Sequence, residues 1–259
     1  MPELPEVEVL RSQLEVVLVG AKIRATRATH LRYRVLGVAG SVIIGVRRRG
    51  KYLLLELDDT RNMVLHLGMT GQLLFEKLPD DHVHLRVYTD RGALYFRDTR
   101  RFGSAYVLGQ GELPKGIYRI LGQEPLEKRF DVGHAAVILD ELGGPLKTRL
   151  LSQRAIAGVG NYIADEALHR SELLPMRREA ENDQLQQLVR NVRIVVKASV
   201  RLGGVSERDY MHLTGGRGAY QDRLRCYGRA GLPCLVCKTP LSWSRVGGRG
   251  STYCLRCQH

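Results

Sequence analysis

Four cysteines near the C-terminus have the spacing of a metal site. Cys234 and Cys237 form one Cys-x2-Cys pair, Cys254 and Cys257 form a second, and sixteen residues separate the pairs. Two such knuckles typically supply four thiolates to one tetrahedral Zn²⁺. Because four protein ligands leave no open coordination position, the sequence predicts one structural zinc ion rather than a catalytic one. Two disulfides or four free thiols are the alternatives, and Cys226, outside the pattern, is expected to be a packed thiol.

The N-terminus, which reads Met-Pro-Glu-Leu-Pro-Glu, also carries residues that can do chemistry. Removal of Met1 would expose the secondary amine of Pro2, and an α-amino group has a pKa of about 7.7–8.0. Much of this amine is therefore neutral near pH 7, and it can attack an aldehyde carbon to form an iminium. Glu3 is then a candidate proton donor and Glu6 a candidate orienting acid. The alternative is an ordinary helix start, where proline and acids are common.

The elements that must position these groups follow from hydrophobic periodicity. A helix is expected from residue 6 to about 19. Residues 22 to about 110 have the pattern of strands in an antiparallel sandwich or barrel, with a hairpin that turns at 90–92. From near 130 the period becomes helical, and the longest predicted helix covers 185–202. A glycine-rich loop and then the cysteine segment follow, so the chain divides into three parts.

The charge balance favours a polyanionic partner. Lys and Arg number 40 against 27 Asp and Glu, which gives a net charge of +13, and no acid occurs after Asp222. Such a surface suits nucleic acid, and a solvated, non-specific basic surface is the alternative. No window approaches 18 consecutive apolar residues, so a membrane span is excluded. The N-terminus has neither the basic region nor the apolar core of a secretory signal, so a cytoplasmic protein is expected.

Several short motifs occur in a fixed order along the chain, together with the cysteines. They are MPELPEVE at the N-terminus, RRGKYL at 48–53, HLGMTG at 66–71, DTRRFG at 98–103, GVGN at 158–161 and YGR at 227–229. This ordered set resembles bacterial formamidopyrimidine-DNA glycosylases (Fpg, MutM) of the Fpg/Nei family, over residues 2–258.

The resemblance implies an α+β, multidomain fold. An N-terminal catalytic β-sandwich domain with a flanking helix would cover 1–128. A helix-two-turn-helix domain would cover 129–222 and include a lesion-capping loop at 203–221, and a zinc β-ribbon would cover 223–259. The implied function is a bifunctional DNA glycosylase/AP lyase of base excision repair, which removes formamidopyrimidines and 8-oxoguanine opposite cytosine and cuts the strand by β,δ-elimination. Its partner would be double-stranded DNA with damaged bases or abasic sites, and we expect a nucleoid-associated monomer.

The resemblance also assigns catalytic roles. Pro2 would attack C1′ of the flipped nucleotide and displace the base, while Glu3 protonates the ring oxygen as the sugar opens. Lys51 matches a lysine near the phosphate beside the lesion, for which a solvated strand-end charge is the alternative. Lys147 aligns with a second active-site lysine.

Three residues match those that fill the void left by the flipped nucleotide, namely Met69, Arg100 and Phe102. An apolar wedge between bases stabilises unstacked DNA, and Arg100 would read the orphaned base. The alternative places Met69 and Phe102 in the sandwich core and Arg100 at its rim.

Phosphate contacts are implied for Asn161, Arg249 and His66. Gly158 and Gly160 free backbone N–H groups at a helix start, which suits an anion. The alternatives are that Asn161 is only an N-cap and that His66 is a hydrogen-bonded strand histidine.

The segment 203–221 departs from the family. Its usual Ser/Thr-rich opening is replaced by Val205-Ser206-Glu207, and a later proline is missing. Glu207 adds an anion and the missing proline loosens the chain, so a shift towards oxidised pyrimidines or abasic sites is a second hypothesis. A non-catalytic damaged-DNA-binding protein is a third, since the basic charge and the zinc ribbon fit binding equally well.

Overall fold

The computed structural model describes residues 2–76, 80–109, 112, 116–206 and 210–259. The chain divides into two compact units. The first holds the chain up to Arg119 together with Val200–Gln221, and the second holds Ile120–Ser199 and Asp222–His259. The domain boundaries expected from the sequence stay a prediction.

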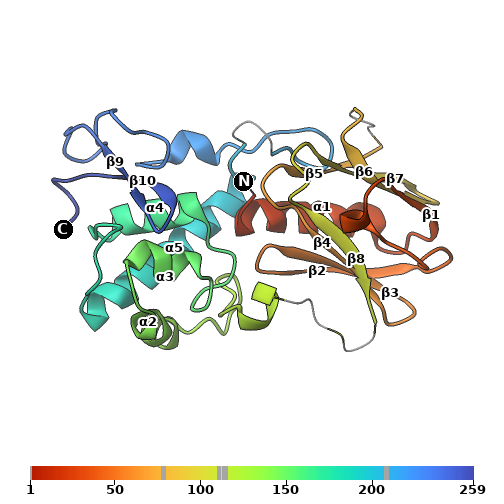
Figure 1. The fold of residues 1–259 in the computed structure, drawn as a ribbon, viewed down its shortest axis with the longest axis horizontal. Coiled ribbons are helices and arrows are strands. Elements are labelled where there is room, and N and C mark those ends of the chain that lie inside the picture. The colour runs from red at the N-terminus through yellow and green to blue at the C-terminus, as the bar shows by residue number, and fades with distance from the viewer. Residues whose placement is uncertain (1, 77–79, 110–111, 113–115, 207–209) are drawn as a thin grey trace. The chain divides into compact units, whose positions relative to one another are not determined.

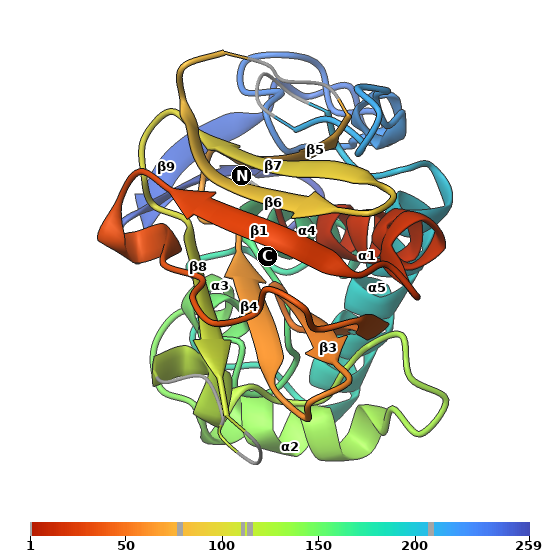
Figure 2. The same cartoon turned by 90° about the vertical axis from the view of Figure 1, so that its right-hand side faces the viewer.

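The first unit contains two four-stranded antiparallel sheets (Figure 2). One has the strand order β1-β6-β7-β5 and the other β2-β3-β4-β8. The strands are β1 (Ile23–Ala28), β2 (Ile43–Arg49), β3 (Tyr52–Leu57), β4 (Asn62–His66), β5 (Gly71–Phe75), β6 (Val83–Thr89), β7 (Gly92–Asp98) and β8 (Ser104–Leu108). Two separate sheets make a sandwich, so the barrel that the strand pattern also allowed is not formed.

Alternating apolar residues explain how the sheets pack. In β6, Val83, Leu85 and Val87 are buried, and β7 returns antiparallel to it with Leu94 and Phe96 buried as well. This is the hairpin predicted around 90–92. Side chains from both sheets share one hydrophobic core, which removes large apolar areas from water and fixes the register of each strand.

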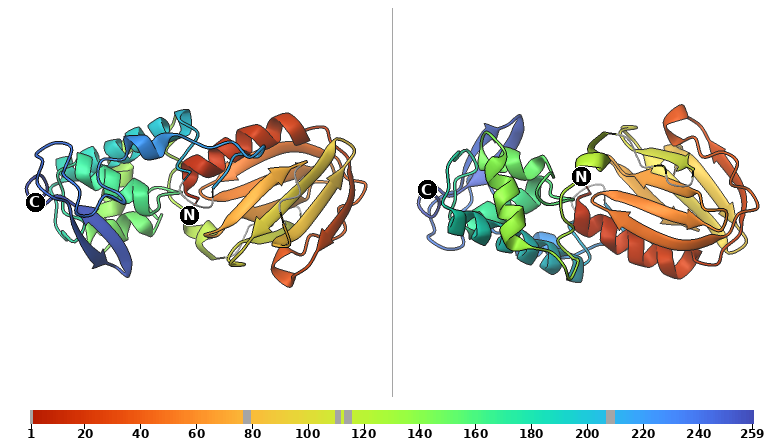
Figure 3. Two further views of the ribbon diagram at one scale, coloured as in Figure 1. Left: turned by 90° about the horizontal axis from the view of Figure 1, so that it is seen from above. Right: turned by 90° about the horizontal axis from the view of Figure 1, so that it is seen from below.

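The helix α1 (Leu4–Leu18) flanks the sandwich (Figure 3). Its apolar residues Val7, Leu10 and Leu14 are buried in the sandwich core, and the helix packs mainly against β2. It begins with a proline in the first turn and ends just before Gly20, whose φ of +84° suits glycine at a helix end.

The second unit contains four helices and a β-hairpin (Figure 1). The helices are α2 (Val132–Glu141), α3 (Leu146–Leu151), α4 (Asn161–Arg170) and α5 (Asn182–Arg201), and the hairpin strands are β9 (Ser242–Val246) and β10 (Arg249–Tyr253). Of the short 3₁₀ helices, η1 (Leu31–Tyr33) belongs to the first unit, and η2 (Gly116–Ile120) and η3 (Tyr220–Arg223) lie where the chain passes from the first unit to the second. In α5 the residues at helical spacing are buried, as the periodicity predicted, and α4 packs against β10. The predicted α+β, multidomain class is confirmed.

Within the described ranges, no helix combines the length and the apolar character needed to cross a lipid bilayer.

Candidate functional site

Pro2 and Glu3 lie directly before α1, and both are buried. Glu6 Oε2 accepts a hydrogen bond from the Glu3 backbone N at 2.7 Å, and the two residues form a capping box. Because this motif fixes the path of the chain into the helix, it also restricts the position of Pro2, the residue before Glu3. Met1 lies outside the described residues.

Glu6 also holds the loop at 203–221. Its Oε1 accepts a hydrogen bond from Val205 N at 2.8 Å, and the Tyr210 hydroxyl donates to the Glu6 backbone O at 3.1 Å. A side chain at Gly204 would place its Cβ 2.8 Å from Glu6 Oε1, and Gly204 has a φ of +84°. With both oxygens accepting N–H groups and 1% of its surface exposed, Glu6 orients the chain around Pro2.

The described part of the loop is closely bonded within the first unit. Gly218 N donates to Ser206 Oγ at 2.8 Å, and Arg217 donates to the Ser206 O. Leu213 N donates to Gln13 of α1, and Phe75 N of β5 donates to the Leu213 O. Glu207, the added anion of the sequence analysis, lies outside the described residues.

Lys51 and His66 lie at the same end of the neighbouring strands β3 and β4. Lys51 stands in the tight turn between β2 and β3, and His66 ends β4. Burial, together with the nearby charge of Lys51, lowers the pKa of His66 to about 4. His66 Nδ1 accepts the Gly68 N–H at 3.3 Å, so the imidazole is neutral at pH 7 and carries its proton on Nε2. The hydrogen-bonded histidine of the alternative is therefore present, and a phosphate contact stays a prediction.

His66 lines a pocket of about 640 Å³. The Tyr52 ring lies 4.6 Å from the imidazole centroid. The lining residues are Tyr52, His66, Ser104, Tyr106, Leu108, Glu112 and Arg119.

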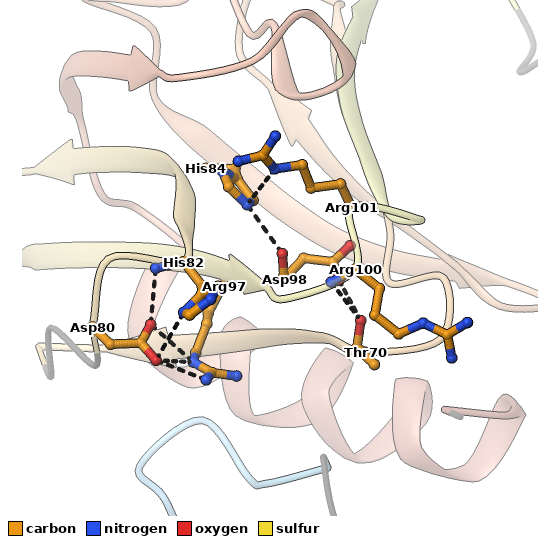
Figure 4. Close-up of polar contacts among 8 residues, drawn as sticks. All are labelled: Thr70, Asp80, His82, His84, Arg97, Asp98, Arg100 and Arg101. Atoms are coloured by element: carbon orange, nitrogen blue, oxygen red, sulfur yellow. Dashed lines mark hydrogen bonds and ion pairs between the residues drawn. The ribbon is translucent and has the colours of Figure 1, made fainter.

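Asp98, at the end of β7, joins the loop that carries Met69 to the loop that carries Arg100 and Phe102. Figure 4 shows Asp98 together with Thr70 and Arg100. Its Oδ1 accepts from the Thr70 hydroxyl at 2.5 Å and from Arg100 N at 3.2 Å. Its Oδ2 accepts from the Gly103 N and from a buried tyrosine hydroxyl, each at 2.7 Å. Asp98 has no exposed surface. Burial would raise the pKa of Asp98, but these hydrogen bonds outweigh it and lower the pKa.

The two loops approach each other closely. A Cβ on Gly68 would lie 2.5 Å from the Phe102 backbone C, and Gly68 has a φ of +62°. Only glycine permits this approach. The Arg100 guanidinium lies 4.7 Å from the Phe102 ring centroid, and Phe102 is 48% exposed. The structure therefore brings Met69, Arg100 and Phe102 to adjoining loops, and Phe102 is not a core residue.

Lys147, expected as an active-site lysine, has several polar partners within the second unit. It is fully buried in the second unit, and its Nζ lies 2.6 Å from Asp165 Oδ1. Nζ also donates to Gly250 O at 2.7 Å and to Ser251 Oγ at 2.8 Å. Burial raises the pKa of Asp165 to about 6, against the lowering effect of the Lys147 ammonium. These contacts hold the Lys147 ammonium in place within the second unit, and its role at an active site stays a prediction.

Asn161 contacts the residue that follows Arg249 in the chain, Gly250. Asn161 is the first residue of α4, whose N-cap is Gly160, so the simple N-cap alternative does not apply. Its Nδ2 donates to Gly250 O at 3.0 Å. Arg249 is exposed at the start of β10. The α4 N-terminus thus contacts the residue that follows Arg249, and phosphate contacts at Asn161 and Arg249 stay a prediction.

The four paired cysteines converge at the base of the hairpin. Their Sγ atoms all lie within 4.8 Å of one another, with Cys234 to Cys257 at 3.9 Å and Cys237 to Cys254 at 3.4 Å. Zn–S bonds of about 2.3 Å in a tetrahedron place sulfurs about 3.8 Å apart, so the geometry fits zinc. Cys226 is buried and contacts Asp165 O instead, as a packed thiol.

Sequence reasoning missed the residues that hold the site together. These residues are Asp98, inside the motif DTRRFG, and Asp165 and Glu166, in a helical segment without a motif. Glu166 is fully buried and accepts hydrogen bonds from the backbone N atoms of Arg225, Cys226 and Tyr227. For Asp98, the signal in the sequence is an acid within an otherwise basic motif.

Three family models match this chain. Residues 1–105 match the formamidopyrimidine-DNA glycosylase N-terminal domain, 121–210 match the formamidopyrimidine-DNA glycosylase H2TH domain, and 231–259 match a zinc finger found in FPG and IleRS.

Full-length relatives carry the same name. The chain is 40% identical over 267 residues to the formamidopyrimidine-DNA glycosylase of Thermus thermophilus, covering 100% of this chain and 98% of that one. It is 32% identical to the Rickettsia bellii enzyme, covering 100% and 99%.

Solved structures agree in fold. The crystal structure of the Thermus thermophilus MutM (FPG) protein is similar with a TM-score of 0.92 and 38% identity, over 99% of this chain and 98% of that one. A Lactococcus lactis FPG mutant in complex with Fapy-dG-containing DNA is similar with a TM-score of 0.92 and 32% identity, over 100% of both chains. MutM in complex with carbocyclic 8-oxo-G-containing DNA is similar with a TM-score of 0.90 and 31% identity, again over 100% of both chains.

Proposed function

The chain belongs to the formamidopyrimidine-DNA glycosylase family, and from this premise we propose that it is a bifunctional DNA glycosylase and AP lyase of base excision repair. The observation that carries the proposal is a full-length match to these enzymes in a chain that keeps Pro2 and Glu3 at the anchored start of α1. Its substrate is double-stranded DNA with a damaged base or an abasic site.

The chemistry begins once Met1 is removed. The Pro2 amine attacks C1′ of the extruded nucleotide, the glycosidic bond breaks, and the base leaves with the electron pair of that bond. The Pro2 nitrogen gives up its proton, which the departing base takes up, and then the C1′–O4′ bond opens and Glu3 protonates O4′. The product is an iminium between Pro2 and C1′, with Glu3 as general acid and Glu6 as the residue that orients both.

Strand cleavage follows from the iminium. It acidifies the C2′ hydrogen, so loss of that proton expels the 3′ phosphate by β-elimination. A second elimination expels the 5′ phosphate, and water then hydrolyses the iminium to free Pro2. Within the first unit, Lys51 and the neutral His66 Nε2–H are the groups we assign to the phosphate beside the lesion. A nearby phosphate would raise the pKa of His66 from its value of about 4 in the free protein.

Extrusion of the nucleotide needs a filler for the gap it leaves. We assign this role to Met69, Arg100 and Phe102, whose loops are tied together by Asp98. Phe102 offers an exposed apolar ring, and the stacked Arg100 offers donors for the orphaned base.

The second unit contributes phosphate binding and stability. Asn161 and Arg249 are the assigned phosphate contacts, supported by their shared link to Gly250 and by the exposure of Arg249. The four cysteines hold one structural Zn²⁺, which folds the ribbon and takes no part in the reaction.

Oxidised purines are the proposed lesions, namely formamidopyrimidines and 8-oxoguanine opposite cytosine. Support comes from the solved relatives in complex with DNA that contains Fapy-dG or carbocyclic 8-oxo-G. We also place the protein in the cytoplasm, at the nucleoid, as a monomer. Four reduced thiolates and a net charge of +13 suit that compartment and partner.

A lesion panel tests the proposal. Wild type, Pro2→Gly, Glu3→Gln and the control Pro5→Ala are compared on duplexes with 8-oxoguanine, formamidopyrimidine, thymine glycol or an abasic site. We expect Pro2→Gly to lose base release and strand cutting by about 100-fold or more, about 2.7 kcal/mol of barrier, because the fixed secondary amine is lost. Pro5→Ala keeps the amine and should stay within about threefold, a barrier change under about 1 kcal/mol.

The outcomes separate the rival functions. An unchanged rate in Pro2→Gly removes Pro2 as the nucleophile. Faster excision of thymine glycol than of 8-oxoguanine supports the oxidised-pyrimidine preference instead. Tight binding of every damaged duplex with no cleavage, by protein whose mass shows loss of Met1, leaves a non-catalytic damaged-DNA-binding protein.

A further inference from the structure

A buried histidine lies beside the cysteine cluster. His169 is in the last turn of α4, is 3% exposed, and places its Nε2 3.5 Å from Cys234 Sγ. Cys234 has no exposed surface. The zinc ribbon and α4 therefore meet at a polar contact, on the side of the cluster that faces the helices of the second unit.

The charge of the site makes this contact significant. Four thiolates and one Zn²⁺ sum to a net charge of −2, and a thiolate with no exposed surface receives no hydrogen bonds from bulk water. An N–H donor offsets part of that negative charge, as outer-shell donors do around other metal sites. The imidazole of His169 is the side chain placed to supply this donor to Cys234.

The surroundings of the second ring nitrogen of His169, Nδ1, indicate which tautomer is present. Among the described residues, His169 Nδ1 has no hydrogen-bond partner. A proton on Nδ1 would be a buried donor without an acceptor, whereas a proton on Nε2 points to sulfur.

We propose that His169 is an outer-shell positioning residue of the zinc centre, whose Nε2–H donates to the Cys234 thiolate and slows the loss of zinc. The inference goes beyond the proposed DNA-repair function and does not depend on it. His169 also completes a row of contacts from α4 to the ribbon, because Asn161 bonds Gly250 O and Asp165 bonds Thr252 N at 3.1 Å. Zinc occupancy is thereby linked to the helix that begins at Asn161.

The test compares three variants of the full-length, zinc-loaded protein. His169→Phe keeps an aromatic ring and removes the donor, and His169→Gln keeps an N–H donor near the position of Nε2. Ser171→Ala is the matched control, since it removes two hydrogen bonds at the end of the same helix without touching the ribbon. The readouts are zinc release to a colorimetric chelator and the sulfur-to-metal charge-transfer band of the Co²⁺-substituted protein.

We expect His169→Phe to release zinc about tenfold faster than wild type and to shift the charge-transfer band, at the lower end of effects seen for outer-shell partners. His169→Gln and Ser171→Ala should match wild type in both readouts. Zinc release and a Co²⁺ spectrum unchanged in His169→Phe would overturn the proposal. Equal acceleration in His169→Phe and His169→Gln would overturn it too, because packing rather than donation would then explain the effect. If His169→Phe does not fold, wild-type behaviour of His169→Gln supports the donor and faster release by His169→Gln contradicts it.

Discussion

At the scale of single residues, Asp98 connects three segments of the first unit. Four donors from three segments converge on its two oxygens, including Thr70 in one loop and Gly103 in the other. A buried carboxylate with this many donors is ionised and strongly held. The positions of Met69, Arg100 and Phe102 therefore depend on a residue that would itself touch no DNA.

Replacing Asp98 by Asn tests this role. The amide presents N–H groups to donors that need an acceptor, so we expect a loss of about 1–3 kcal/mol in the free energy of unfolding at pH 7. Urea unfolding of the first unit is followed by far-UV circular dichroism, because the single tryptophan, Trp243, lies in the ribbon. Asp80→Asn is the control. Its partly exposed ion pair with Arg97 (Figure 4) should contribute less than about 1 kcal/mol.

The direction in which pH changes the effect of Asp98→Asn on the free energy of unfolding can also be predicted. Since folding lowers the pKa of Asp98 below the ordinary 3.8, its contribution is complete above that pH and is lost as the pH falls through the folded-state pKa. The difference in the free energy of unfolding between wild type and Asp98→Asn should therefore become smaller below pH 4. A gap that stays constant from pH 7 to pH 3 would show that the carboxylate charge is not what holds the loops.

At the scale of elements, the sequence predicted most of what is observed. Alternation predicted the β6–β7 hairpin, and helical spacing predicted α1 and α5. These patterns are local, so they can be read from neighbouring residues. The spacing of the cysteines likewise predicted the metal cluster, because knuckle geometry is set by two or three residues.

Contacts between distant segments could not be predicted in the same way. Lys147 pairs with Asp165 and donates a hydrogen bond to the hairpin, more than a hundred residues away in the chain. The hydrogen bond from Val205 N to Glu6 joins residues that are 199 positions apart in the chain. Neither pairing has a periodic or short-range signal, since each depends on which surfaces meet in the folded unit. A lysine can bind the substrate or stabilise the fold, and the sequence alone does not show which contacts it makes in the folded protein.

At the scale of the whole molecule, the excess of 13 positive charges predicts salt-dependent DNA binding. Each neutralised phosphate contributes a slope of about −0.9 to a plot of log affinity against log salt concentration. If Arg249 contacts one phosphate, Arg249→Ala should reduce that slope by about 0.9 and weaken binding of all sequences alike.

Fluorescence anisotropy on a duplex with a stable abasic-site analogue measures this slope. Arg256→Ala is the charge-matched control, because Arg256 is exposed between Cys254 and Cys257 and Arg249 lies at the other end of β10. An equal change of slope in both variants would mean that net charge acts without a specific contact at Arg249.

The central claim is that the N-terminal proline is the nucleophile of a glycosylase and lyase. It is tested most directly by borohydride reduction of the protein with an 8-oxoguanine:cytosine duplex, followed by peptide mass mapping of the adduct. We predict one covalent adduct, on the peptide that begins at Pro2 and lacks Met1, and none on the Lys51 or Lys147 peptides. An adduct on a lysine peptide, or no adduct from protein that lacks Met1 and binds the duplex, would contradict the account.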